Sequence, residues 1–274
     1  MAYVKSGYEI LIGLLRLSIA PVHTHHTMPK STTQRRARLI LSVITLVCLP
    51  IGALLFVWLV TLPNVSALKT RNPSTTTLME MRQAQAHERG ETIERQWQWV
   101  PLARISPHLR RAVVAAEDAS FFTHEGFDWE GIRDAAIANF ETGELKRGGS
   151  TITQQLAKNL YLSSERSMFR KAREALITRL LEHHLRKERI LELYLNVAEW
   201  GIGVYGAEAA AYHHFQKSSH DLTLEEAAWL AAILPSPLRY DPIRKTSALS
   251  RRYERIFYRI TRTTRYPSSK HDSQ

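Results

Sequence analysis

Two adjacent acids, Glu117 and Asp118, are the first residues of this sequence that could do chemistry. They follow a stretch in which apolar residues have helical spacing, so both stand at the end of a helix that must be buried. A carboxylate in such surroundings is costly unless it is paired, hydrogen-bonded or used as a general acid or base. His124 and Asp128 follow in a short loop, and Asp128 lies where it would cap the next helix. A structural cluster of caps and salt bridges explains this block as well as catalysis does.

A glycine turn that opens a helix is the second feature. Gly148 and Gly149 allow a ligand to approach the backbone closely, and Thr151 with Gln154 has the spacing of a capping box. A helix N-terminus with a lysine one or two turns on suits a phosphate, although the ending of a nucleotide P-loop is missing. Taken alone, this block fits an ordinary surface helix better. The residues expected on its polar face are Thr151, Gln154, Gln155 and Lys158.

A basic helix and a polar helix end follow. Arg170 and Lys171 lie four and three residues before Glu174, which is the spacing of solvated ion pairs on one helix face. Asn196 belongs to a fourth block, and the glycine-rich loop Glu199–Gly206 after it is expected to close over the core. Most of this fourth block is therefore interpreted as architectural.

The elements that must position these blocks are helices. Apolar residues recur three or four apart through most of the chain after Trp97, and no alternating β pattern stands out. The catalytic region is therefore expected to be mainly α. The predicted helices are Leu109–Ala116, Trp129–Phe140, Ile152–Tyr161, Met168–Lys187, Ile190–Val197, Ala207–Phe215, Leu224–Leu234 and Ala248–Thr261.

One uncharged segment, Leu39–Leu62, predicts a membrane span. As a helix its 24 residues would be roughly 36 Å long, enough to cross a bilayer. Arg35, Arg36 and Arg38 precede it, so the positive-inside rule keeps the N-terminus in the cytoplasm and the rest of the chain outside. A buried core helix and a cleavable signal peptide are the competing interpretations.

Composition limits what remains. The chain has 274 residues, and the part that remains after the N-terminal membrane region is subtracted has room for one domain of ordinary size. The net charge of +11 favours partners that carry phosphate, such as anionic lipids, a phosphorylated substrate or nucleic acid, but no nucleic-acid motif is present. The single cysteine, Cys48, excludes a disulfide or a thiolate metal site within one chain.

The predicted organisation has five parts. Residues 1–38 form a cytoplasmic arm in which Met28 is an alternative start, 39–62 a transmembrane helix, 63–96 a linker that contains a short helix, 97–262 the catalytic domain, and 263–274 a disordered tail.

Taken in order, the four blocks resemble the glycosyltransferase family 51 domain of the peptidoglycan glycosyltransferases. The shared motifs are EDxxFxxHxGxD, GGSTITQQLAKN, RKxxE and YLN, and the similarity extends from about Trp99 to Pro242. With one membrane anchor and no room for a transpeptidase domain, the chain looks like a monofunctional member. The resemblance implies a lysozyme-like, mainly α fold after a single transmembrane helix. It also implies polymerisation of lipid II through β-1,4 linkages, with inversion and release of undecaprenyl pyrophosphate.

The same resemblance implies roles for individual residues. Glu117 would be the general base that deprotonates the acceptor 4-hydroxyl. Glu174 would be the second catalytic acid, orienting nearby cations or holding a divalent ion, Mg or Mn, although no cofactor is required. Residues expected to bind substrate or its pyrophosphate are Ser150, Gln154, Gln155, Lys158, Arg170 and Lys171, and those expected to support the site are Asp118, His124, Gly148, Gly149 and Asn196.

These implications set the expected partners and location. The partners are lipid II, the growing glycan strand, the inner (cytoplasmic) membrane and proteins of cell-wall synthesis, with the catalytic domain in the periplasm. Two alternatives stay open. One is a lysozyme-like enzyme that cleaves glycan, which has no need of a pyrophosphate site. The other is a catalytically inactive anchor for cell-wall synthesis proteins.

Overall fold

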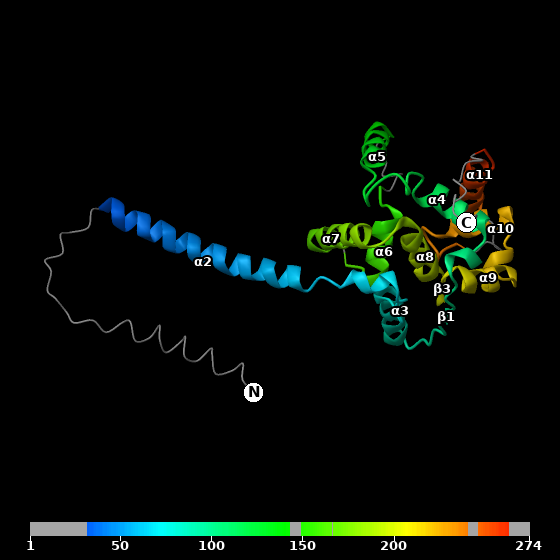
Figure 1. Ribbon diagram of the computed structural model, residues 1–274, viewed down its shortest axis with the longest axis horizontal. Helices are drawn as coiled ribbons and strands as arrows, with labels where there is room; N and C mark the ends of the chain where they lie inside the picture. Colours follow the sequence, from blue (N-terminus) through cyan, green and yellow to red (C-terminus); the bar gives the residue numbers. More distant parts are fainter. Residues whose placement is uncertain (1–31, 143–148, 166, 241–245, 263–274) are drawn as a thin grey trace, which may run out of the picture. The chain divides into compact units, whose positions relative to one another are not determined.

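The computed structural model describes residues 32–142, 149–165, 167–240 and 246–262, and the chain divides into two compact units after Thr61 (Figure 1). Met28, Gly148, Pro242 and the predicted tail at 263–274 lie outside the described residues.

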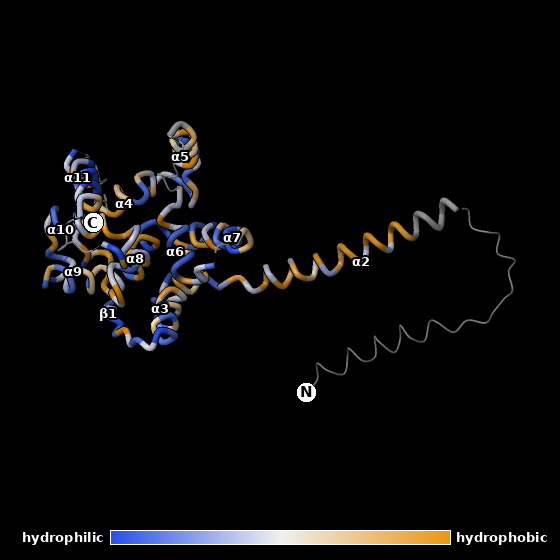
Figure 2. Tube along the Cα trace, turned by 180° about the vertical axis from the view of Figure 1, so that it is seen from behind, coloured by the Kyte–Doolittle hydropathy of each residue, from blue (hydrophilic) through white to orange (hydrophobic). Residues whose placement is uncertain are grey.

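The first unit contains one long apolar helix, α2 (Thr32–Val60), which is orange along most of its length in Figure 2. Its apolar side chains stay uncovered, with Leu46 77% and Leu54 70% exposed. These exposed apolar side chains favour a membrane span over a buried core helix. Within the described ranges, this is the one helix long and apolar enough to cross a membrane.

The second unit is mainly α, as the periodicity predicts. Seven of the predicted helices agree to within a few residues: α4 (Pro107–Glu117), α5 (Trp129–Thr142), α6 (Ile152–Tyr161), α8 (Lys187–Val197), α9 (Ala207–Phe215), α10 (Leu224–Ile233) and α11 (Ser247–Arg262). The remaining helix, α7 (Met168–His184), ends three residues earlier than predicted. Leu185 takes an extended backbone conformation there but stays buried, so the apolar pattern continues across the break between α7 and α8.

The segment predicted as a linker, residues 63–96, is folded onto the second unit. It contains η1 (Val65–Lys69) and α3 (Thr77–Glu88), and their apolar side chains Leu68 and Met79 are buried. Arg82 of α3 forms an ion pair with Glu199 at 2.9 Å. A few apolar anchors in a polar stretch fix this segment, and such sparse anchors do not stand out as a periodic pattern.

A small sheet accompanies the helices and was not predicted. β3 (Val204–Tyr205) lies between β1 (Gln96–Trp97), which runs parallel to it, and β2 (Glu199–Gly201), which runs antiparallel. Strands of two or three residues are too short to show alternation between buried and exposed side chains.

The core joins two groups of helices. α4 packs against α10 and α11, while α6 packs against α7, α8 and α3. Trp200 is fully buried, and its indole N–H donates to the Leu230 carbonyl at 3.1 Å. α4 and α6 therefore belong to different groups, and the segments that join them carry the polar residues described next.

A glycine at the start of α9 gives a prediction about stability. Gly206 has φ +82°, and a Cβ there would lie 2.7 Å from the carbonyl oxygen of Asn196. Gly90 has a similar φ of +71°, but its surroundings are open. We expect Gly206→Ala to lower the free energy of unfolding by about 2–4 kcal/mol and Gly90→Ala by about 1 kcal/mol. Denaturant titration followed by circular dichroism measures both, and equal losses would show that the close contact at Gly206 carries no cost.

Candidate active site

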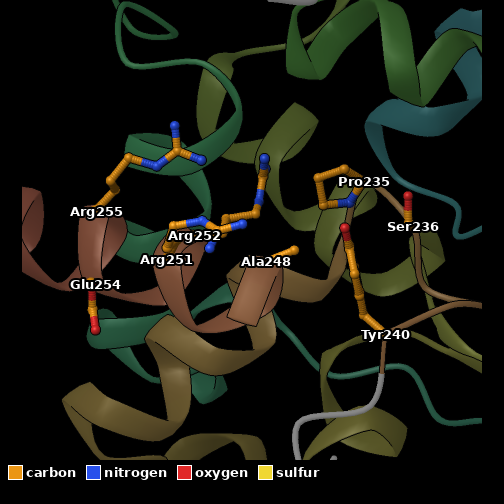
Figure 3. Close-up of a pocket in the computed structure, with 8 residues that line it drawn as sticks. All are labelled: Pro235, Ser236, Tyr240, Ala248, Arg251, Arg252, Glu254 and Arg255. Carbon is orange, nitrogen blue, oxygen red and sulfur yellow. The ribbon is translucent and has the colours of Figure 1, made fainter. Parts of the chain in front are cut away.

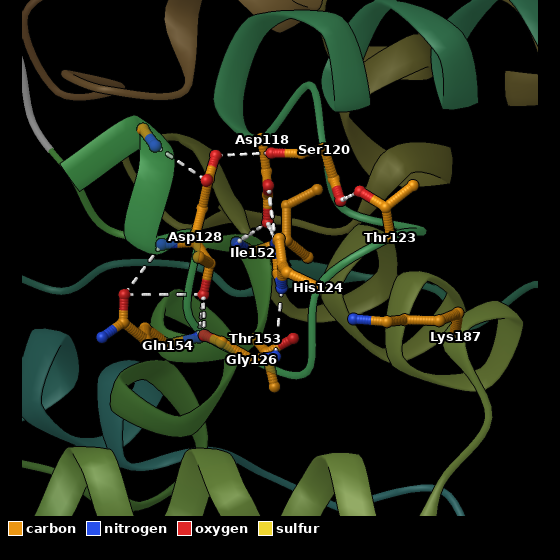
Figure 4. A network of polar contacts seen from close by, with 12 residues as sticks. Asp118, Ser120, Thr123, His124, Gly126, Asp128, Ile152, Thr153, Gln154 and Lys187 are labelled. Carbon is orange, nitrogen blue, oxygen red and sulfur yellow. Dashed lines mark hydrogen bonds and ion pairs between the residues drawn. The ribbon is translucent and has the colours of Figure 1, made fainter. Parts of the chain in front are cut away.

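Asp118 joins the end of α4 to the start of α6 (Figure 4). Its carboxylate accepts from the backbone N–H of Ile152 at 2.9 Å and lies 2.9 Å from Nε2 of His124. The backbone N–H of Gly126 donates to Nδ1 of His124 at 3.0 Å, so the proton of the neutral ring is on Nε2 and is donated to Asp118. Asp118 and His124 thus fix the loop that follows Glu117.

Asp128 fixes the other end of this loop. It accepts from the hydroxyl of Ser120 and from the backbone N–H of Gly131 at 2.8 Å, which caps the first turn of α5. These two hydrogen bonds, the one from Ser120 first, lower the pKa of Asp128. The capping position predicted for Asp128 is confirmed.

Glu117 is held between two donors. The amide of Gln155 donates to one carboxylate oxygen at 2.8 Å, and a guanidinium N–H of Arg252 donates to the other at 2.7 Å. The hydroxyl of Tyr194 donates to the amide oxygen of Gln155 at 3.0 Å, which orients that amide. Burial, and after it the charge of Glu117, raises the pKa of Tyr194 well above its ordinary value, so Tyr194 remains a hydrogen-bond donor.

A cavity of about 160 Å³ lies beside Glu117. Ser150, expected to bind substrate, lines it together with Glu117 and Asp128. Arg259 also lines it and donates to the carbonyl of Ala115 at 3.0 Å. The cavity is open to solvent and small, so it has room for one polar group of a larger ligand next to the acid.

A cation cluster surrounds Glu174 on α7. Glu174 is only 3% exposed, and its two oxygens accept from Arg170, at 2.7 Å, and from Lys171. This pairing is more than the solvated set of ion pairs that the spacing alone suggests. The buried carboxylate of Glu174 thus holds the side chains of Arg170 and Lys171 next to each other.

Lys158 of α6 extends this cation cluster. Lys158 is exposed at the surface, but partial loss of water around its ammonium group lowers its pKa below the ordinary 10.5. The negative charge of Glu174 acts in the opposite direction and raises this pKa. Arg170, Lys171 and Arg82 lower the pKa further. Lys158 therefore shares a region of concentrated positive charge with the cations of α7 and α3, which suits a ligand of high negative charge.

The described part of the glycine turn is exposed, whereas the capping box after it is buried. Gln154 is buried and its side-chain oxygen accepts from the backbone N–H of Thr151 at 2.9 Å, which confirms the capping box. That side chain holds the start of α6 rather than facing the cavity as expected for a substrate contact. Gly149 is exposed just before Ser150, while Gly148 lies outside the described residues.

Asn196 is fully buried near the end of α8. Its side chain accepts from the backbone N–H of Val100 and donates to the Val100 carbonyl, both at 2.9 Å. Its own carbonyl accepts from the indole of Trp97 at 2.7 Å. Asn196 thus ties the end of α8 to the segment before α4.

Glu174 does not fit the role of metal ligand. Both of its oxygens already face cations, and a divalent ion would have to displace Arg170 or Lys171. No group of three His, Cys, Asp or Glu side chains suited to a metal occurs in the part of the chain that the structure describes.

Two contacts of this site were missed in the sequence. Arg252 of α11 contacts Glu117 from 135 residues away, and the Arg82–Glu199 pair joins α3 to β2. A signal for Arg252 was available, since the arginines of α11 recur three or four apart and predict a basic helix face. These arginines are Arg251, Arg252, Arg255, Arg259 and Arg262.

The Glu174 cluster gives a second prediction about stability. Glu174→Gln removes the negative charge but keeps the shape, leaving Arg170 and Lys171 against each other. We expect the free energy of unfolding to fall by about 2–3 kcal/mol. In the matched control Asp134→Asn, which breaks the exposed Arg133–Asp134 pair, the loss should stay below about 0.5 kcal/mol. Thermal denaturation compares the two, and similar losses would mean that the Glu174 cluster contributes no more than a surface pair.

In this helical domain α6 carries both Gln155, which contacts the Glu117 carboxylate, and Lys158, which lies among concentrated cations, and this arrangement suits group transfer from a phosphorylated donor. Residues 83–261 match the transglycosylase family, and the chain belongs to that family. The resemblance found in the sequence, with its mainly α, lysozyme-like fold, is thereby confirmed.

Relatives of the chain agree with this assignment. It is 51% identical over 191 residues to the biosynthetic peptidoglycan transglycosylase of Laribacter hongkongensis, covering 67% of this chain and 84% of the relative. To the protein of the same name from Bordetella pertussis it is 48% identical over 231 residues, covering 82% and 94%. The similarity thus spans most of each relative.

Proposed function

We propose that this protein polymerises lipid II into the β-1,4-linked glycan strands of peptidoglycan. Its relatives carry the name biosynthetic peptidoglycan transglycosylase, and the chain shares their family. The observation that carries the proposal is that α6 contacts both halves of the site. Its Gln155 holds Glu117, and its Lys158, three residues on, joins the cations around Glu174.

Glu117 is the general base in this proposal. Its carboxylate has about four lone-pair positions, and Gln155 and Arg252 use two, so a further position can accept the proton of the acceptor 4-hydroxyl. The oxygen of that hydroxyl then bonds to the anomeric carbon of the donor, while the bond from that carbon to the diphosphate oxygen breaks. Attack from the opposite face inverts the anomeric centre.

The cation cluster stabilises the leaving group. Negative charge grows on the diphosphate as the bond breaks, and Lys158, Arg170 and Lys171 are the cations that face this charge. Arg170 and Lys171 act on Lys158 through their charges, so the three cations can attract the diphosphate together. Glu174 acts through the cations that it orients.

Helix α2 anchors the enzyme where its substrate is. A lipid-linked sugar stays in the membrane, and an enzyme held at the same surface meets it at high effective concentration. The arginines before the apolar segment orient the N-terminus toward the cytoplasm, with the catalytic domain at the periplasmic face of the inner membrane. Other proteins of cell-wall synthesis would meet the enzyme there.

Incubation of the full-length protein in detergent with purified lipid II tests this proposal. A ladder of glycan polymers on a gel is the expected result. Shortening of preformed glycan without polymer growth would indicate a lysozyme-like hydrolase, and no reaction at all an inactive anchor. The same assay with a chelator tests the expectation that no divalent ion is required.

A further inference from the structure

A second and larger cavity lies between the segment after α10 and the first turns of α11 (Figure 3). Its volume is about 560 Å³, within the range of small-ligand sites. We call it the α11 arginine pocket. Its lining residues are Pro235, Ser236, Tyr240, Ala248, Arg251, Arg252, Glu254 and Arg255.

Positive charge dominates the α11 arginine pocket. Three arginines line it against one acid, Glu254, whose carboxylate points away from the Arg255 guanidinium in Figure 3. Among the described residues, Arg251 and Arg255 line the cavity and form no ion pair, so their guanidinium donors are free to meet a ligand. Donors left unused in a cavity favour a ligand that brings acceptor oxygens.

The α11 arginine pocket adjoins the proposed catalytic acid. Arg252 lines the pocket with part of its side chain, and its Nη2 lies 2.7 Å from the carboxylate of Glu117. A ligand in the pocket would therefore lie one side chain away from the reacting groups. A group bound there would lie within reach of a substrate held at Glu117.

We infer that the α11 arginine pocket binds an anionic oxygen group of the substrate, either a carboxylate of its peptide or a phosphate. This inference rests on the proposed function. Guanidinium groups match carboxylates and phosphates through paired hydrogen bonds, and the hydroxyls of Ser236 and Tyr240 add donors. The leaving diphosphate has its own cations on α6 and α7, so the peptide carboxylates are a separate group that this pocket can take.

Equilibrium binding of a labelled lipid II whose 4-hydroxyl is blocked tests the inference, because this probe cannot be joined to a chain. The full-length protein in detergent micelles is compared with the double variant Arg251→Ala and Arg255→Ala, which spares Arg252. We expect the double variant to bind the probe about tenfold more weakly. The comparison is repeated with a probe that lacks the peptide. If the wild type and the double variant then bind this probe equally well, the pocket binds a peptide carboxylate. If the double variant again binds about tenfold more weakly, the pocket binds the diphosphate.

Arg262→Ala is the matched control, because it removes one arginine from α11 outside the pocket, where Arg262 lies over the ring of Tyr258. If the double variant binds both probes within twofold of this control, the inference is wrong. Arg255→Lys adds a second check, since it keeps the charge and should recover only part of the affinity. Binding is read without turnover, so failure of the wild type to polymerise lipid II counts against the proposed function alone.

Discussion

Glu117→Gln is expected to lower kcat for glycan chain growth by about 10²–10⁴-fold with little change in the fold. Glutamine has nearly the same shape, and its amide oxygen can still accept from Arg252. It cannot take up the proton of the acceptor hydroxyl, so the attacking oxygen must lose that proton without a base. Gel analysis of lipid II products under single-turnover conditions measures the loss, and circular dichroism checks the fold.

Glu125→Gln is the control for this prediction. Glu125 lies in the same loop region but is exposed, and it pairs with Arg179 at 2.6 Å. Its replacement should leave kcat within about twofold of the wild type, since a surface ion pair contributes little. Chain growth by Glu117→Gln within tenfold of the wild-type rate would remove Glu117 from the role of general base. A Glu117→Gln protein that folds normally and still supports cell-wall synthesis would favour the inactive-anchor alternative.

The sequence predicted those parts of the molecule that depend on neighbouring residues. Helices appear in it because the same face is apolar every three or four residues, and the capping box at Thr151 and Gln154 is a contact across three positions. Asp128 as a cap is equally local. Such features can be read from a short window because both partners lie within it.

Contacts between distant segments could not be predicted in this way. The guanidinium of Arg252 reaches Glu117 only because α11 packs against α4, and nothing near either residue specifies that packing. The Arg82–Glu199 pair likewise depends on the fold of the segment expected to be a linker. Gln154 shows a further limit of sequence-based prediction. Periodicity predicts which helix face a residue lies on, but it does not show that the side chain of Gln154 is already engaged in capping α6.

Spacing along α6 explains why one short helix can connect the acid with the cations. Residues three apart on a helix are neighbours on its surface, so Gln155 and Lys158 project from adjacent positions. Tyr194 orients Gln155, which contacts Glu117. The charges of Arg170 and Lys171 on α7 act on Lys158 and lower its pKa. In the proposed mechanism, α6 would therefore position both the base that takes the acceptor proton and a cation that stabilises the leaving group.

Lys158→Met is expected to lower kcat for chain growth by about 10²–10³-fold, because it removes a positive charge where the leaving diphosphate gains negative charge. Methionine keeps most of the side-chain volume. Lys158→Arg keeps the charge and should lose less. The comparison is made with lipid II as substrate under saturating conditions, and an equal loss in both variants would show that shape rather than charge matters at this position.

The pH dependence of these variants separates charge from structure. Loss of water and neighbouring cations hold the pKa of Lys158 below 10.5, so kcat/KM of the wild type should fall as the pH rises through this lowered pKa. Lys158→Arg stays protonated throughout and should keep its kcat/KM to higher pH.

The free energy of unfolding should change with pH in the opposite direction. Between the lowered pKa and 10.5 the unfolded chain binds more protons at this group than the folded chain, so the free energy of unfolding rises with pH there. This rise should be absent in Lys158→Met, and an alkaline decline in kcat/KM shared by the wild type and Lys158→Arg would place the titrating group elsewhere.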